Sequence, residues 1–173
     1  MKRSVKILVT ALFSAVTLFV GSSAKAQDAP PAGGFKNAYL IVNKSGKVVL
    51  TYSCYDHQVK KGDYTLLFFW ASWSDESRAQ VPYVQAVHRK YDGKVKVLGV
   101  PYGDEISDTM DAMTELGITF PQLVDVDDDI AGRFELDSVP LVVLLGPDGK
   151  TVAAGLSGDG IGMTLEEIQP IAR

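Results

Sequence analysis

The sequence contains a single cysteine, Cys54, among its 173 residues. One cysteine cannot form a disulfide within the molecule, and no pair of thiols can be oxidised and reduced in turn. Histidine is almost as scarce. The two present, His57 and His88, are too few to favour a dedicated zinc site. We therefore expect no metal centre and no other cofactor.

The sequence also lacks an apolar run long enough for a confident membrane-spanning helix. The N-terminal run, Ile7 to Val20, has 14 residues, whereas a spanning helix needs about 20. Basic residues precede this run, and Ala-Lys-Ala follows it at positions 24–26 as a cleavage site, a pattern typical of a secretory signal peptide. We expect residues 1–26 to be removed, 27–37 to form a Pro/Gly/Ala linker, and 38–173 to form one domain. An uncleaved N-terminal anchor is the alternative.

Basic residues are in the minority. The predicted signal peptide carries four of them and no acidic residue, so the rest of the chain has 13 Lys and Arg against 21 Asp and Glu, a net charge of −8. Such a balance disfavours binding to nucleic acid or to an anionic membrane surface. We expect an exported domain, in the periplasm or outside the cell, with no integral membrane segment after cleavage.

What the chain does contain is a regular alternation of strand and helix patterns. A hairpin is predicted over residues 38–52, and continuous apolar runs predict buried strands. Apolar residues at helical spacing predict the helices, and a Thr164–Glu167 capping box predicts the start of a C-terminal helix. The strands are expected at 64–70, 95–100 and 141–145, and the longer helices at 75–91 and 106–116. This order predicts a three-layer α/β fold, with a mixed central sheet flanked by helices and an extra N-terminal hairpin.

One stretch has the outline of a reactive site. In WASWSDESR, residues 70–78, an apolar strand leads into a helix that starts with two identical residues spaced i, i+3. These residues are Ser74 and Ser77, and the acidic Asp75 and Glu76 lie between them. Serine is a favoured N-cap residue, so a purely structural role for Ser74 is expected as well.

The motif and its surroundings resemble the thioredoxin superfamily, and within it the exported TlpA/ResA-type thiol-disulfide oxidoreductases. The resemblance is carried by LLFFWASW, by Arg78 and Pro82 after the motif, and by LGV, ELGITFPQLVD and DSVPLVVLLGPDGKTV further on. It implies a thioredoxin-like fold over most of the domain, and a cis-proline at Pro140 facing the motif. It also implies a Cys-x-x-Cys where this chain has serines, and an acidic residue where it has Gln80.

The serines remove the chemistry that the resemblance implies. A serine hydroxyl ionises far less readily than a thiol and cannot form a disulfide. What is left is a binding surface, for which we expect Trp70, Trp73, Val139 and Pro140 to form an apolar floor. The two acids of the motif would give it a negative rim. The expected partner is an extended peptide or an envelope protein, and the oligomeric state is left open.

Several alternatives remain open from sequence alone. The domain could be a thiol-disulfide oxidoreductase that works through Cys54 with an external thiol, although a partly buried, inert Cys54 is favoured. It could also be a structural part of an envelope assembly, and the serines could be natural or engineered. A serine hydrolase is disfavoured because His88 is about 21 Å along the same helix from Ser74. A calcium loop at 125–129 is disfavoured because the glycine and glutamate of that motif are missing.

Overall fold

The computed structural model describes residues 37–125 and 127–167. The predicted signal peptide and nearly all of the predicted linker lie outside these residues. No helix in the described ranges is long and apolar enough to cross a membrane. The strands are β1 (Asn37–Val42), β2 (Val48–Ser53), β3 (Tyr64–Trp70), β4 (Val95–Pro101), β5 (Gln122–Val124), β6 (Leu141–Leu145) and β7 (Thr151–Ala154). The helices are α1 (Tyr55–Gln58), α2 (Asp75–Lys90), α3 (Ile106–Glu115), α4 (Asp129–Arg133) and α5 (Gly160–Glu167).

The strands form one sheet in the order β2-β1-β5-β4-β3-β6-β7. β3 and β4 run parallel, as do β4 and β5, whereas β1–β2, β1–β5, β3–β6 and β6–β7 are antiparallel. The predicted mixed sheet is therefore confirmed. The predicted N-terminal hairpin, β1–β2, extends the sheet beyond β5.

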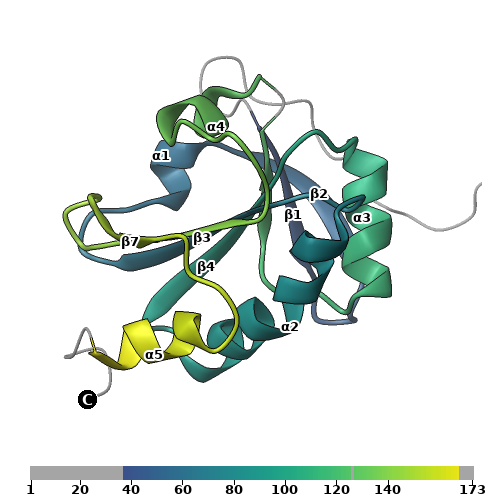
Figure 1. Cartoon of the computed structure of the whole chain (residues 1–173). Coiled ribbons are helices and arrows are strands. Elements are labelled where there is room, and N and C mark those ends of the chain that lie inside the picture. Colours follow the sequence, from purple (N-terminus) through teal and green to yellow (C-terminus); the bar gives the residue numbers. More distant parts are fainter. Residues whose placement is uncertain (1–36, 126, 168–173) are drawn as a thin grey trace, which may run out of the picture.

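Helices cover both faces of this sheet, which gives three layers (Figure 1). One face packs against α2, α3 and α5, and the other against α1 and α4. β3 contributes side chains to the hydrophobic core on each face of the sheet, because successive side chains of a strand point to opposite faces. Leu66, Phe68 and Trp70 lie in the first core, and Leu67 and Phe69 lie in the second. Each such side chain stabilises the fold by about 1.5–3 kcal/mol on full burial.

The predicted start of the C-terminal helix is wrong. Helix α5 begins at Gly160, so Thr164 lies inside the helix and does not cap it. The reason is packing: Ile161 and Leu165, four residues apart on one face, are both buried against the first core. A helix that starts at Thr164 would leave Ile161 outside it, and this burial outweighs the local preference for a capping box.

Candidate functional site

The motif loop joins the end of β3 to the start of α2. Ser74 is the N-cap of α2, with an extended backbone, and its Oγ accepts a hydrogen bond from the Ser77 N–H at 3.1 Å. The Ser74 hydroxyl in turn donates to Glu76 Oε2 at 3.3 Å. Asp75 and Glu76 lie in the first turn, where carboxylates are stabilised by the positive end of the helix dipole. The predicted capping role of Ser74 is confirmed.

Ser77 is the more deeply placed of the two serines. Its side chain is completely buried, and its Oγ accepts a hydrogen bond from the Ala71 N–H at 3.2 Å. This bond satisfies a backbone N–H in the loop that would otherwise have no water or protein partner. The second motif position is therefore a joint between the loop and the helix.

Neither serine has the surroundings of an activated nucleophile. A nucleophilic serine needs a base within hydrogen-bond reach, and the side-chain partners of Ser74 are a backbone N–H and a carboxylate. His88 lies in the last turn of α2, at the far end of the helix. His57 lies in α1, which covers the opposite face of the sheet. The geometry gives no support to hydrolase chemistry.

The two tryptophans of the motif have opposite environments. Trp70 is completely buried, stacks on Phe68 with ring centroids 6.0 Å apart, and donates from Nε1 to Gln122 Oε1 at 2.8 Å. Its predicted place in the floor of a binding surface is wrong, because the alternation of β3 puts position 70 in the core beneath α2. Trp73, which lies past the end of the strand, is 66% exposed.

The Trp70 side chain depends on a buried amide that the sequence analysis missed. Gln122 is completely buried, accepts from Trp70, and donates from Nε2 to the Phe120 carbonyl at 3.0 Å. It fits only because its neighbour on β4 is Gly99, where an added Cβ would be 1.9 Å from Gln122 Oε1. A glycine within a buried strand is a recognisable sign that another group approaches closely.

The loop after β4 fixes the motif loop from the side. Asp104 accepts two hydrogen bonds from Ser72, from the N–H at 2.7 Å and from Oγ at 2.9 Å. The Tyr102 N–H donates to the Trp70 carbonyl at 2.8 Å. Burial raises the pKa of Asp104, and the two bonds from Ser72 oppose that rise. The exposed ring of Trp73 lies beside Gly103 in the same loop.

The Val139–Pro140 turn lies at the same end of the sheet. Its peptide bond is cis, and both side chains are half-buried. β6 pairs with β3 so that Leu141 is opposite Phe69, and Pro140 is therefore level with Trp70. Of the four residues expected in the apolar floor, the structure places Trp73, Val139 and Pro140 at the carboxyl end of β3, and it buries Trp70 in the core.

Gln80 has a structural partner. Its Oε1 accepts a hydrogen bond from the Gly158 N–H at 2.8 Å and so ties α2 to the segment before α5. An amide has no ionisable proton. At this position the chain therefore has a structural contact and no group that can relay protons.

Cys54 is far from the motif. It follows β2, precedes α1, and is half-buried, as predicted. β1, β5 and β4 separate β2 from β3 in the sheet, so strand spacing alone puts Cys54 about 19 Å from the end of β3. Its reactivity stays a prediction.

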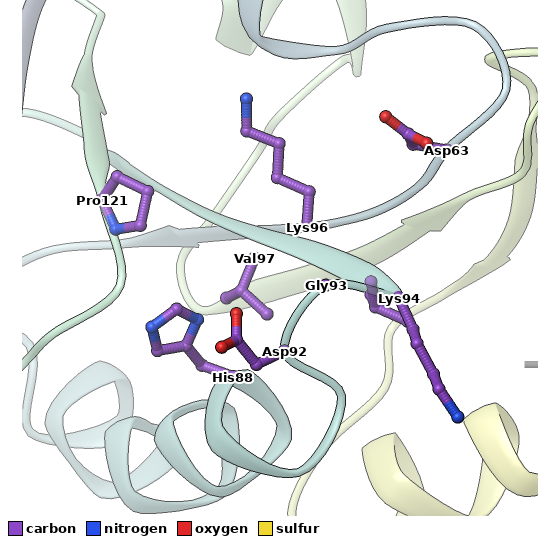
Figure 2. A pocket seen from close by; sticks show the side chains of 9 residues that line it. Asp63, His88, Asp92, Gly93, Lys94, Lys96, Val97 and Pro121 are labelled. Carbon is purple, nitrogen blue, oxygen red and sulfur yellow. The ribbon is translucent and has the colours of Figure 1, made fainter. Parts of the chain in front are cut away.

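A pocket of about 280 Å³ opens at the amino ends of β3 and β4, opposite the end that carries the motif loop (Figure 2). His88 and Asp92 lie side by side in it, and Lys96 extends away from them. Burial lowers the pKa of His88, and burial together with the nearby Lys60 lowers the pKa of Lys96. Lys96 donates to the Gln58 carbonyl at 2.7 Å. Seven-residue strands separate this pocket from the motif loop, a distance of roughly 20 Å.

The acidic run after β5 is organised by one carboxylate. Asp125 Oδ2 accepts hydrogen bonds from the Ile130 and Ala131 N–H groups at 2.8 and 2.7 Å, so it satisfies the first turn of α4. Burial raises the pKa of Asp125. Within the ranges 37–125 and 127–167, no group of three or more His, Cys, Asp or Glu side chains could hold a metal ion.

Fold and site together define a thioredoxin-like domain in which Ser74 caps the first long helix and Ser77 lies buried in its first turn. The family model described as Thioredoxin-like matches residues 62–151, just over half of the chain, and the chain belongs to this family.

Its relatives include the thiol-disulfide oxidoreductase ResA of Bacillus subtilis, 29% identical over 94 residues, which are 53% of this chain and 52% of that protein. ResA of Geobacillus kaustophilus is 23% identical over 143 residues, 78% of this chain and 82% of that one. The chain thus aligns with about half the length of the B. subtilis relative.

Solved structures agree on the fold. The thioredoxin domain of a thiol-disulfide oxidoreductase from Bacteroides vulgatus superposes with a TM-score of 0.59 at 25% identity, over 78% of this chain and 95% of that one. StoA from B. subtilis superposes with a TM-score of 0.56 at 19% identity, over 75% and 94%. The predicted thioredoxin-like fold and the resemblance to ResA-type proteins are confirmed.

Proposed function

We propose that this protein is an exported thioredoxin-like binding domain without dithiol redox activity. The observation that carries the proposal is the state of the two motif hydroxyls. Ser74 and Ser77 are buried, and both hydroxyls accept structural hydrogen bonds from backbone N–H groups of the same loop and helix turn. The positions that would carry sulfur in a dithiol enzyme serve here to hold the loop in shape.

The chemistry of disulfide exchange supports the same conclusion. Exchange needs a thiolate that attacks a disulfide and a second thiol that resolves the mixed disulfide. The whole sequence offers one thiol, that of Cys54. This residue follows β2, which is at the edge of the sheet, far from the motif. The helix start cannot compensate, because no surrounding charge makes a hydroxyl a disulfide-forming group.

The surface around the motif has the features of a recognition site. Trp73 is exposed, and the half-buried Val139 and Pro140 lie at the same end of the sheet. Exposed tryptophans commonly supply most of the binding energy at an interface. Asp75 and Glu76 are exposed next to Trp73 on α2, and Glu135 and Asp137 precede the proline turn. This acidic rim favours an extended segment of an envelope protein that carries lysine or arginine beside an apolar residue.

Peptide binding tests the proposal. The protein is titrated with extended peptides that share one apolar residue and differ only in flanking lysines or glutamates. Binding to the lysine peptides that weakens at least about tenfold in Trp73→Ala is the expected result, since central tryptophans dominate such interfaces. Tyr83→Ala, at an exposed aromatic residue further along α2, is the matched control. Equal binding by the wild type and Trp73→Ala would contradict the proposal.

The alternative activity is thiol-disulfide exchange through Cys54. The names of the relatives and the partial exposure of Cys54 favour it. Insulin reduction by dithiothreitol separates the two functions: we expect the wild type to match the uncatalysed rate, as Cys54→Ser does. Turnover that disappears in Cys54→Ser would establish the alternative.

A further inference from the structure

The two edges of the sheet differ in how open they are to another strand. β7 has four residues, pairs with β6 through a register irregularity at Leu144/Leu145, and is followed by Gly155 in the left-handed region. Short, irregular edges resist pairing with other chains. β2 has six residues, VVLTYS, and pairs with β1 in unbroken register from Val48 to Ser53. It contains no proline, glycine or charged residue, so its own sequence has none of the residues that usually block an edge.

The turn of the hairpin shows which backbone groups of β2 face outward. Asn43 donates its N–H to the Lys47 carbonyl, so these two residues form a hydrogen-bonded pair. Such pairs alternate along an antiparallel ladder. Val49, Thr51 and Ser53 therefore turn their backbone groups toward β1, and Val48, Leu50 and Tyr52 turn theirs away from the sheet. In the described part of the chain, no strand pairs with this outer edge.

We propose that the β2 edge pairs with β2 of a second copy of the chain. In an antiparallel, two-fold arrangement centred on Leu50, Leu50 of one copy is opposite Leu50 of the other, and Val48 is opposite Tyr52. All outward N–H and C=O groups of the three residues are then paired. Val49 of each copy is opposite Thr51 of the other in a non-hydrogen-bonded pair, where side chains approach most closely.

The side chains suit this register. Pairs of an aromatic with a β-branched residue, such as Tyr52 with Val48, stabilise antiparallel strands, and no like charges meet along the strand. The charges beyond its ends are complementary. Lys44 and Lys47 precede β2 and Asp56 follows it, and the same register places the lysine end of one copy beside the aspartate end of the other. Asp56 is 78% exposed although it bonds Arg133.

A two-fold pairing of this kind closes on itself, because the outer edge of β2 in each copy is covered by β2 of the other. It also leaves Trp73 and the proline turn accessible, since β2 is at one end of the strand order and β3 and β6 are near the other. The inference is therefore independent of the proposed binding function.

Sedimentation velocity of the purified protein tests the pairing over concentrations from about 1 µM to about 1 mM, which cover weak and transient association. We expect a concentration-dependent shift from monomer to dimer. Val49→Lys/Thr51→Lys places like charges opposite each other in both symmetric pairs, and it should weaken association at least tenfold. Val49→Lys/Thr51→Glu places each lysine opposite a glutamate and should restore it.

The control variant is Thr151→Lys/Val152→Lys, which puts the same charges on the β7 edge and should leave the association unchanged. Circular dichroism checks that each variant is folded. A monomer at every concentration would overturn the proposal, as would a dimer that persists in Val49→Lys/Thr51→Lys or one that only the β7 variant dissociates. Failure of Val49→Lys/Thr51→Glu to restore the dimer would overturn the proposed register.

Discussion

The two ends of the β3–β4 pair use polar side chains in different ways. At the carboxyl end, Ser74, Ser77 and Asp104 each bond backbone N–H groups of the motif region, and the hydroxyls are buried. At the amino end, His88 and Asp92 face an open pocket (Figure 2). The charges along α2 complement its helix dipole: acidic residues lie in its first turn, and His88, Arg89 and Lys90 lie in its last.

The difference separates polar groups that hold the fold in shape from polar groups that face solvent. Functional sites usually keep some polar groups poorly satisfied, because those groups must interact with a substrate. At the motif end, both serine hydroxyls accept a hydrogen bond from a backbone N–H, and the loop is also bonded to Asp104. We infer that the hydroxyls of Ser74 and Ser77 contribute stability, whereas His88 at the pocket end makes stability depend on pH. The following predictions test this contrast, beginning with the largest effect.

Gly99→Ala should give the largest loss of stability. The added methyl group would overlap Gln122 Oε1 and displace the amide that holds Trp70 and the Phe120 carbonyl. Overpacking together with a lost buried hydrogen bond should lower the free energy of unfolding by about 2–4 kcal/mol. Urea denaturation measures this, with Gly132→Ala, where nothing lies within 4 Å of the added atom, as the control. Equal midpoints for the two variants would contradict the packing argument.

The sequence predicted the framework of the sheet and the long helices because these elements have strong internal patterns. Tyr64–Trp70 is apolar throughout, and α2 has apolar residues at helical spacing. The buried network was harder to predict, because Gln122 and Trp70 are 52 residues apart and nothing local links them. The start of α5 was missed for the same reason: burial of Ile161 depends on the long-range core.

The motif itself was only partly predictable. Serine at a helix start indicated the cap at Ser74, and that role needs only local geometry. The bond from Ala71 to Ser77 depends on how the loop turns back onto the helix, and the burial of Trp70 depends on which face of β3 meets α2. Those features belong to tertiary structure, and the pattern of neighbouring residues does not encode them.

Ser77→Ala should give a smaller loss than Gly99→Ala. It removes the acceptor for the buried Ala71 N–H and leaves that donor without a partner. An unsatisfied buried group costs about 1–3 kcal/mol, which urea denaturation resolves. Ser107→Ala, at an exposed position in α3, is the matched control. A stability equal to that of the wild type would mean that the motif end is not the structural joint described above.

The smallest effect is expected at the pocket end and depends on pH. Burial lowers the pKa of His88 in the folded protein, with Asp92 opposing and Arg89 reinforcing that shift. Below a pH of about 6.5 the unfolded chain takes up a proton on this residue, whereas the folded protein resists doing so. The free energy of unfolding is therefore highest above this pH and falls as the pH drops toward the lowered pKa.

His88→Gln should remove that part of the pH dependence. Denaturation of the wild type and the variant is compared from pH 8 down to pH 5, and their difference in stability should change in favour of the variant as the pH falls. His57→Gln controls for the loss of an imidazole elsewhere on the protein. Because the pocket is open to solvent, the change should be smaller than that caused by Ser77→Ala, which lies in the core. A pH dependence that is the same in the wild type and His88→Gln would show that His88 does not contribute to the pH dependence of stability.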